Sequence, residues 1–378
     1  MENIPFNKPY MTGRELDYIA KAHANGHLSG DGPFTKRCHE FLQNLTTSHK
    51  ALLTHSCTAA LEMAALLLDL QPGDEVIMPS YTFVSTANAF VLRGAVPVFV
   101  DIDAHTLSID HRLIESAITP RTKAICVVHY AGVGCDMDAI MDISRQHDIP
   151  VVEDAAQGIY STYKGKPLGS IGHLGALSFH ETKNVISGEG GALLINDTKL
   201  AERAELIREK GTNRSRFFRG QVDKYTWVDL GSSFLPGEIT AAFLYAQLQE
   251  GEDITRRRMN LWSQYHEWTV QFADRLQRPS LPADCTHNAH MYYLVLPDLG
   301  CRTKVIAELK ERGIQSVFHY LPLHEAPAGR RYGRAHGELP VTMNVSDCLL
   351  RLPLWIGLDA HIERVLSSLG EVLEANLP

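Results

Sequence analysis

Short apolar runs alternate with longer amphipathic stretches through the first two thirds of the chain. The runs are rich in β-branched residues and cover residues 75–80, 96–102, 123–130, 149–155, 175–180 and 191–197. Apolar runs of about this length are typical of strands. The stretches between them carry apolar residues at helical spacing, over residues 58–70, 86–94, 110–118 and 137–147. Near-continuous apolar strands separated by helices predict a largely parallel sheet that is covered on both faces.

The pattern changes after residue 237. A long helical stretch over residues 238–276 is predicted to lead away from the sheet, and a smaller α+β unit follows it. That unit is predicted to contain strands at 290–296 and 314–320 and helices at 303–313 and 362–377. A chain of 378 residues is also long for one core. We therefore expect an α/β fold with a large domain over residues 1–245, followed by a linking helix and a small C-terminal α+β domain over residues 246–378.

Composition and charge narrow the classes of function. No apolar run approaches the roughly 18 residues of a membrane span, and the first residues lack the basic and apolar regions of a secretion signal. The 36 Lys and Arg residues against 44 Asp and Glu give a net charge of −8, unlike a general nucleic-acid binder. Seven cysteines are scattered without the spacing of a metal site. We expect a cytoplasmic enzyme with reduced thiols and no bound metal, acting on neither nucleic acid nor membrane.

Conspicuous polar and aromatic side chains gather where several predicted strands end. They come from four separate segments: Cys57 and Thr58, Phe83, Asp154 and Gln157, and Ser178 and Lys183. In open α/β sheets, ligands bind outside the carboxyl ends of the strands. The four segments are therefore predicted to face one crevice.

Each of these residues also has an ordinary structural interpretation. Asp154 could cap the turn after its strand, Thr58 could be the N-cap of its helix, and Lys183 could be solvated. The glycines after this lysine could serve only a tight turn: Gly188, Gly190 and Gly191. The joint occurrence of all these residues at the ends of predicted strands favours a binding site over the separate structural explanations.

Two longer elements carry a family resemblance. The stretches "VVEDAAQG" and "GALSFHETKNVISGEGGAL" resemble the signature of the DegT/DnrJ/EryC1/StrS sugar aminotransferases, and the similarity extends from "IPFNKPYMTGREL" to "RLPLW". The resemblance implies fold type I of the pyridoxal-phosphate (PLP) enzymes, which is the aspartate aminotransferase-like fold with a mainly parallel central sheet. It also implies PLP as the cofactor and a nucleotide-linked keto sugar as the substrate.

The resemblance implies a role for each residue of the predicted crevice. Lys183 matches the lysine whose amine forms an imine with the pyridoxal aldehyde and then carries a proton between carbon atoms. Asp154 matches the partner of the pyridinium nitrogen, and Gln157 matches the residue hydrogen-bonded to the ring oxygen. Phe83 matches the aromatic side chain stacked on the ring. The phosphate-binding positions of the family match Cys57, Thr58 and Ser178.

Other matched positions imply a homodimer with shared active sites. Many relatives have an Asn that reaches the phosphate in the neighbouring subunit, and this chain has Ser233 there. Lys224 matches a position near the adjoining subunit's substrate, although its basic segment could also be a solvated loop. His319 and Tyr320 match positions that line the sugar pocket, where ordinary strand residues are the alternative.

The resemblance further implies the reaction. We expect transfer of an amino group from L-glutamate to the C4 keto group of dTDP-4-keto-6-deoxyglucose, yielding the 4-amino-4,6-dideoxygalactose product for enterobacterial common antigen or a related surface polysaccharide. Two alternatives remain. A PLP-dependent sugar dehydratase of the same family would carry histidine in place of Lys183. A non-catalytic binding or regulatory relative would lack some of Lys183, Asp154 and Gln157, and all three are present.

Overall fold

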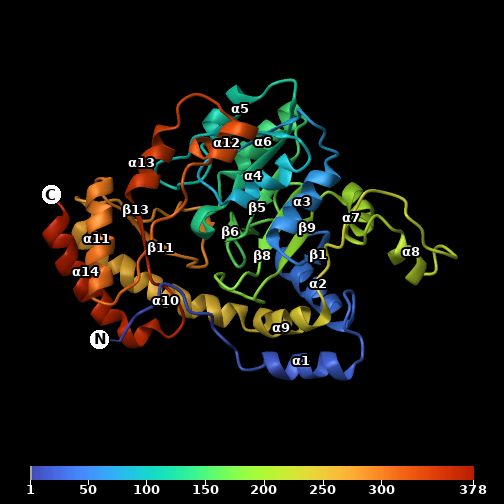
Figure 1. Ribbon diagram of the computed structural model, residues 1–378, viewed down its shortest axis with the longest axis horizontal. Coiled ribbons are helices and arrows are strands. Elements are labelled where there is room, and N and C mark those ends of the chain that lie inside the picture. Colours follow the sequence, from blue (N-terminus) through green and yellow to red (C-terminus); the bar gives the residue numbers. More distant parts are fainter. Residues whose placement is uncertain (1) are drawn as a thin grey trace.

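An eight-stranded sheet forms the centre of the computed structural model, which describes residues 2–378 (Figure 1). Its strands lie in the order β1-β9-β8-β5-β4-β2-β3-β12. Their bounds are β1 Lys50–Thr54, β2 Glu75–Pro79, β3 Val96–Val100, β4 Thr122–Val128, β5 Val151–Asp154, β8 Leu174–Ser178, β9 Gly191–Ile195 and β12 Arg334–Ala335. Strand β9 pairs antiparallel with β1 and β8, whereas the other neighbours pair parallel. The prediction of a largely parallel sheet is confirmed.

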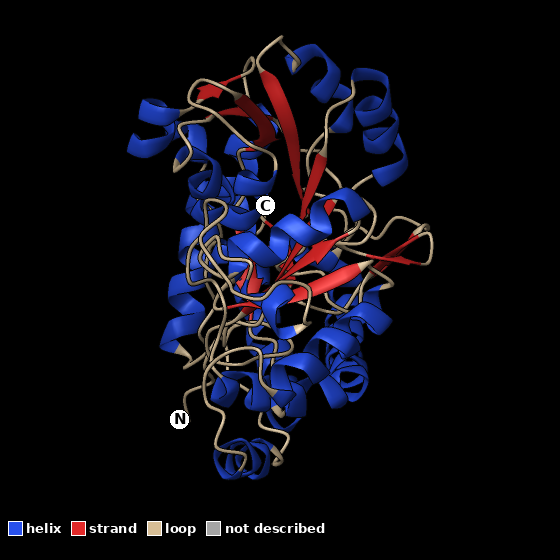
Figure 2. Cartoon of the chain, turned by 90° about the vertical axis from the view of Figure 1, so that its right-hand side faces the viewer, coloured by secondary structure: helices blue, strands red, loops and turns tan. Residues whose placement is uncertain are grey.

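The central strands are apolar at nearly every position because both faces of the sheet are covered. Along β2, Ile77 packs into one hydrophobic cluster, whereas Val76 and Met78 pack into another on the opposite face. Helices supply many of the other residues of both clusters, and Figure 2 shows helices on both sides of the strands. These helices are α1 Glu15–Ala24, α2 Pro33–Thr46, α3 Cys57–Leu67, α4 Val84–Val91, α5 Ile114–Ala117, α6 Met137–His147, α7 Ala201–Arg208 and α9 Glu238–Gln249.

A separate hydrophobic cluster lies in the C-terminal part of the chain, around a two-stranded sheet of β11 (Tyr292–Val295) and β13 (Leu349–Leu352). Three helices pack on these strands: α10 Gly251–Trp268, α11 Leu299–Glu311 and α14 Ile362–Asn376. We call this arrangement the β11–β13 unit. The predicted strand at 290–296 and the two predicted helices correspond to β11, α11 and α14. The division of the chain at residue 245 remains a prediction.

Short elements complete the chain. They are β6 Thr162–Tyr163, β7 Lys166–Pro167, β10 Cys285–Thr286, α8 Arg214–Phe218, α12 Pro327–Tyr332 and α13 Pro340–Cys348. The seven cysteines are free thiols. Across residues 2–378, no helix has the length and apolar character needed to cross a membrane.

The predicted helical stretch over residues 238–276 is helical through Phe272, but it forms two α-helices, since α9 and α10 are separated at Glu250. The Tyr160 hydroxyl donates to the Leu248 carbonyl, which occupies an acceptor at the end of α9. The Tyr160 ring also lies where a side chain on residue 251 would be: a Cβ on Gly251 would come within 2.2 Å of Oη. Helix α9 packs against the sheet cluster, so it is α10 that leaves the sheet.

Three other expectations differ from the structure. Residues 110–118 form a 3₁₀ turn followed by the short α5, rather than one helix. Residues 314–320 do not form a strand, because their pairing partner changes: Ile314 bridges to Ile4, whereas Val317 bridges to Arg351. Strand β1 was not predicted, since "KALLT" contains no Val or Ile and has only Thr54 as a β-branched residue.

Candidate active site

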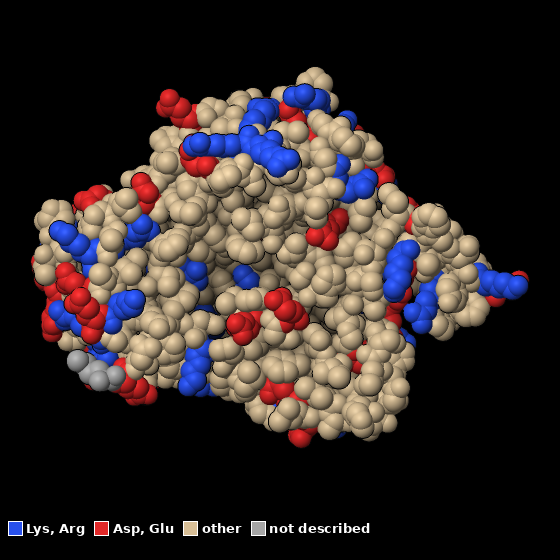
Figure 3. All heavy atoms as spheres, in the orientation of Figure 1, with Lys and Arg blue, Asp and Glu red and all other residues tan. Residues whose placement is uncertain are grey.

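A cavity of about 640 Å³ opens where the carboxyl ends of the central strands meet the β11–β13 unit. In Figure 3 its mouth is the hollow near the centre of the face, with basic and acidic side chains around it. The predicted site residues that line it are Cys57, Thr58, Phe83, Asp154, Gln157, Ser178, Lys183, His319 and Tyr320. Lys224 and Ser233 do not line it. The predicted convergence of four segments on one crevice is confirmed.

Asp154 is the last residue of β5 and is 6% exposed. Its Oδ2 accepts a hydrogen bond from the Thr86 hydroxyl at 2.7 Å, and its Oδ1 accepts one from the Ala156 N–H at 3.1 Å. Burial raises the pKa of this carboxyl, while these two donors and the nearby Lys183 ammonium act in the opposite direction. The bond from Ala156 is the turn contact expected of a capping Asp. It occupies only one oxygen, so capping explains only part of this position.

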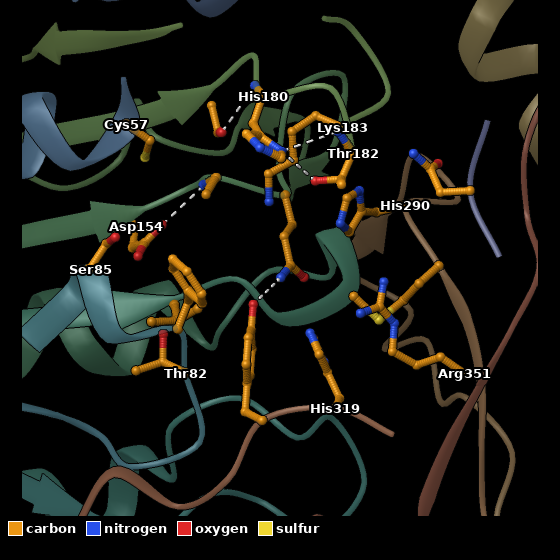
Figure 4. Close-up of a pocket in the computed structure, with 18 of the residues that line it drawn as sticks. Cys57, Thr82, Ser85, Asp154, His180, Thr182, Lys183, His290, His319 and Arg351 are labelled. Carbon is orange, nitrogen blue, oxygen red and sulfur yellow. Dashed lines mark hydrogen bonds between the residues drawn. The ribbon is translucent and has the colours of Figure 1, made fainter. Parts of the chain in front are cut away.

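Lys183 follows β8, and its backbone N–H donates to the His180 carbonyl at 2.9 Å. Its side chain turns into the cavity rather than outward to solvent (Figure 4). Burial lowers the pKa of its ammonium group, against the raising effect of Cys57 and Asp154. A lysine that loses its proton more readily becomes a nucleophile and a base. The solvated-lysine interpretation is therefore wrong.

The N-terminus of α3 forms another wall of the cavity. Ser56 is the N-cap, since its Oγ accepts from the Ala59 N–H at 3.1 Å, so the alternative that Thr58 is the N-cap is wrong. Thr58 lies in the first turn, and its hydroxyl donates to Ser85 Oγ at 2.8 Å. The amides of this turn have no acceptor within the helix, and the helix dipole favours negative charge here. Ser178, at the end of β8, lines the same cavity.

The glycines after Lys183 have different roles. Gly188 has φ of +79° with open space around it, which is the ordinary requirement of a turn. Gly191 begins β9, and a Cβ there would lie 2.4 Å from the Cys57 nitrogen. Its missing side chain therefore lets β9 pack against the first turn of α3. Gly190 itself lines the cavity.

The wall opposite α3 is aromatic and polar. Gln157 Oε1 accepts from the Ala131 N–H at 2.6 Å, and its Nε2 donates to the Tyr320 hydroxyl at 3.0 Å. His319 stacks on Tyr320 with ring centres 3.6 Å apart. Burial lowers the pKa of His319 far below its ordinary value, so its ring is neutral. Phe83 is 57% exposed although it faces the cavity, which leaves an aromatic surface available to a ligand.

Sequence reasoning missed several residues of this site. Thr86 holds Asp154, and the buried His290 and the half-buried Arg351 line the cavity from the β11–β13 unit. Arg351 could have been found from the sequence, since it is a single charged residue inside the apolar run "LLRLPLW". His290 and Thr86 had none, because a single His or Thr near an apolar segment is common in cores.

Lys224 and Ser233 belong to the segment of residues 209–236, whose ends pack on the body and whose middle part, around α8, projects from it (Figure 1). Both are exposed, and Ser233 forms a β-bridge with Glu209. Large apolar side chains are also exposed there, with Trp227 at 75% and Phe218 at 69%. Within one chain, these two residues therefore lie apart from the other predicted site residues.

Comparison with known proteins shows full-length similarity. The profile of the DegT/DnrJ/EryC1/StrS aminotransferase family matches residues 9–370. The spore coat polysaccharide biosynthesis protein SpsC of Bacillus subtilis is 33% identical over 98% of this chain and 97% of its own length. GDP-perosamine synthase of Caulobacter vibrioides is 33% identical over 99% of each chain.

A solved structure with the same fold is the PLP-form of the putative sugar aminotransferase Spr1654 from Streptococcus pneumoniae. It superimposes with a TM-score of 0.91 and 29% identity, covering 100% of both chains. The predicted α/β aminotransferase fold is confirmed by this superposition.

Proposed function

Because the chain belongs to the DegT/DnrJ/EryC1/StrS aminotransferase family and is a PLP-dependent sugar aminotransferase, we propose that it transfers an amino group from L-glutamate to the C4 keto group of dTDP-4-keto-6-deoxyglucose. The observation that supports this most directly is the meeting of Lys183 and Asp154 in one cavity with the first turn of α3. These three elements provide an amine, a carboxylate and an anion site.

The residues of the cavity fit PLP. The amides of Cys57 and Thr58 in the first turn of α3, together with Ser178, would hold the phosphate. Asp154 is a buried carboxylate that has no cationic hydrogen-bond partner among residues 2–378, which suits a protonated ring nitrogen. The exposed face of Phe83 would cover the ring, and Gln157 would bind its oxygen.

When bound, PLP supplies an aldehyde for the amino group and a ring that withdraws electrons from the carbon losing its proton. We propose that Lys183 Nζ removes that proton and returns it at the neighbouring position, which its lowered pKa favours. Asp154 keeps the ring nitrogen charged, and its bonds from Thr86 and Ala156 hold it in place. The walls of the cavity limit the access of water to the reacting atoms.

We propose that two chains build each active site. Lys224 belongs to the projecting part of the 209–236 segment, and Ser233 lies exposed at its base, bridged to Glu209. The exposed aromatic side chains of this segment suit burial against a second copy. A two-fold dimer would make this contact twice, so that each segment reaches the partner's cavity. Lys224 would bind the nucleotide diphosphate there, and Ser233 would approach the phosphate of the cofactor.

The proposal also specifies which nucleotide sugar accepts the amino group. His319 and Tyr320 line the cavity and would offer hydrogen bonds to sugar hydroxyls. We propose that the reaction occurs in the cytoplasm and feeds enterobacterial common antigen or a related surface polysaccharide. One relative is named for spore coat polysaccharide and another for a GDP-linked amino sugar, so GDP-linked substrates are the second candidate.

A substrate panel tests the proposal. Purified enzyme with PLP and L-glutamate is incubated with dTDP-, UDP- and GDP-linked 4-keto-6-deoxy sugars, and the products are identified by NMR. We expect amination at C4 of the dTDP sugar with galactose configuration, together with release of 2-oxoglutarate. Amination only of another nucleotide sugar would overturn the substrate assignment, and absence of any amination would overturn the proposed activity.

A further inference from the structure

His290 lines the cavity from the turn that leads into β11, and one nitrogen of its ring is held by the chain. Nδ1 lies 3.1 Å from Asn184 Oδ1, and Asn184 directly follows Lys183 in the sequence. Nε2 makes no hydrogen bond within residues 2–378 and is not enclosed by protein atoms, so it faces the cavity that His290 lines. One nitrogen of this ring is therefore anchored beside Lys183, and the other is open to a ligand.

The side-chain amide of Asn184 can take only one orientation. Its nitrogen Nδ2 lies 2.7 Å from the backbone carbonyl of Asn288, and a carbonyl can only accept, so the NH₂ group must be on that side. Oδ1 therefore faces His290, and since this oxygen cannot donate, His290 Nδ1 must carry the proton of their hydrogen bond. Asn288 is fixed in turn, because its side chain donates to the carbonyls of Gln157 and Ile159 at 2.8 Å each.

The open nitrogen of His290 is consequently an acceptor without a proton. Burial holds the pKa of His290 well below its ordinary value, and three nearby cations act in the same direction: Lys183, Arg258 and Arg351. The ring is therefore neutral, and with its one proton on Nδ1 it presents a lone pair to the cavity. Arg258 also fixes the backbone here, since it donates to the carbonyls of Ala289 and His290 at 3.1 and 2.9 Å.

An acceptor in this wall favours ligand groups that donate a hydrogen bond. The carboxylates of L-glutamate have no proton to donate at neutral pH, whereas each hydroxyl of a sugar has one. The hydroxyl must lie near the reacting carbon, because His290 is anchored beside Lys183 and faces the same cavity (Figure 4). In a 4-keto-6-deoxy sugar, the carbons next to C4 are C3, which carries a hydroxyl, and C5, which carries the methyl group. The C3 hydroxyl is therefore the donor closest to the site of reaction.

We propose that His290 Nε2 accepts a hydrogen bond from the C3 hydroxyl of the keto sugar, an inference that rests on the proposed amination at C4. His290 is then a specificity-determining residue, which favours sugars with a C3 hydroxyl over 3-deoxy sugars. A site that binds a hydroxyl discriminates against a ligand without it, because the protein acceptor is left unpaired when such a ligand excludes water. The contact acts on the sugar and not on glutamate, so it separates the two substrates that share the cavity.

Two ligands that cannot react test the proposal: dTDP-6-deoxygalactose and its 3-deoxy counterpart. Both carry a hydroxyl at C4 in place of the keto or amino group, and their affinities for the PLP-loaded enzyme are measured by calorimetry. We expect the unaltered enzyme to bind the ligand with the C3 hydroxyl about ten-fold more tightly. His290→Asn keeps an N–H near the place of Nδ1 for the bond to Asn184 but removes Nε2, so this preference should fall below about two-fold.

The matched control is His287→Asn. His287 belongs to the same turn but does not line the cavity, and its Nδ1 accepts from the Ala289 N–H at 3.2 Å, a bond that the oxygen of asparagine can keep. This variant should retain the preference of about ten-fold.

Two results would overturn the proposal: equal binding of the two ligands by the unaltered enzyme, or a His290→Asn variant that weakens both ligands alike and keeps their ratio. If His290→Asn loses its cofactor absorbance or its fold, His290→Leu decides by the same ratio. Both ligands carry the same nucleotide, so an error in the proposed nucleotide weakens them equally and leaves the ratio unchanged. The substrate panel responds to that error, so its failure and the failure of this inference are distinguishable.

Discussion

Replacing Asp154 by Asn is the sharpest test of the proposed chemistry. The change keeps the size and one acceptor of the side chain, so the bond from either Thr86 or Ala156 can persist. It removes the negative charge that would keep the ring nitrogen of the cofactor protonated. We therefore expect the fold and much of the cofactor affinity to remain, while proton transfer at the reacting carbon slows.

The expected loss follows from the burial of this residue. Asp154 is 6% exposed, so an effective dielectric constant of about 20 applies rather than that of water. An opposite charge at about 4 Å then interacts with about 4 kcal/mol. Since about 1.4 kcal/mol changes a rate ten-fold, loss of the whole interaction would slow the step about a thousand-fold. Asn retains a hydrogen bond, so we expect a loss between about a hundred-fold and a thousand-fold.

The assay is the single-turnover reaction with L-glutamate, followed by the absorbance of the cofactor at saturating PLP. Thr86→Val is the control, because it removes one bond of 2.7 Å and leaves the charge. It should slow the step only about ten-fold, since a hydrogen bond to a charged group contributes about 1.5 kcal/mol. The Thr86 hydroxyl also holds the pKa of Asp154 down, so its loss should move the acid limb of the pH profile to higher pH. If Asp154→Asn reacts at the normal rate, the reasoning is refuted.

Three further predictions concern the lysine, the phosphate and the dimer. Borohydride should fix the cofactor on Lys183, as mass spectrometry of peptides would show, and Lys183→Ala should not complete transamination; labelling of another lysine would contradict the assignment. Ser178→Ala should weaken PLP retention in equilibrium dialysis by about ten-fold or more, since a hydrogen bond to a charged group contributes about 1.5 kcal/mol or more; unchanged retention would remove Ser178 from the phosphate site. Lys183→Ala and Lys224→Ala should each be inactive, whereas differently tagged subunits that have exchanged should recover about a quarter of normal activity, because half of the random dimers regain one of two sites. Verified hybrids as inactive as their parents would exclude a shared site.

The parts of the site that were predictable lie on the parallel sheet. Phe83, Asp154 and Lys183 lie at or just beyond the ends of strands whose apolar runs are plain in the sequence, and the carboxyl ends of such strands meet at one edge. From this rule, residues that are distant in the sequence can be predicted to lie close together before any side-chain packing is known. It applies only to residues that follow these strands.

The opposite wall of the cavity was less predictable for a physical reason. Arg351 and His290 reach the cavity through the packing of the β11–β13 unit, which no local pattern describes. The interruption between α9 and α10 arises in the same way, because Tyr160 comes from a segment about 90 residues earlier and shapes the contact at Gly251. Such long-range contacts decide where a helix ends and which side chains reach the cavity, and the local helix or strand propensity of the sequence does not reveal them.

The charged groups in the cavity also affect how much of the protein stays folded in the cell. Asp154, Lys183 and Arg351 all lose solvent when the chain folds, and burial opposes the charged form of each. Ligands that pair with these groups bind the folded chain and not the unfolded one, so they stabilise it by mass action, by about 2.7 kcal/mol at a hundred times the Kd. The pool of unfolded protein that proteases can degrade should therefore shrink as vitamin B6 supply rises. Melting temperature measured against PLP concentration would follow the same law.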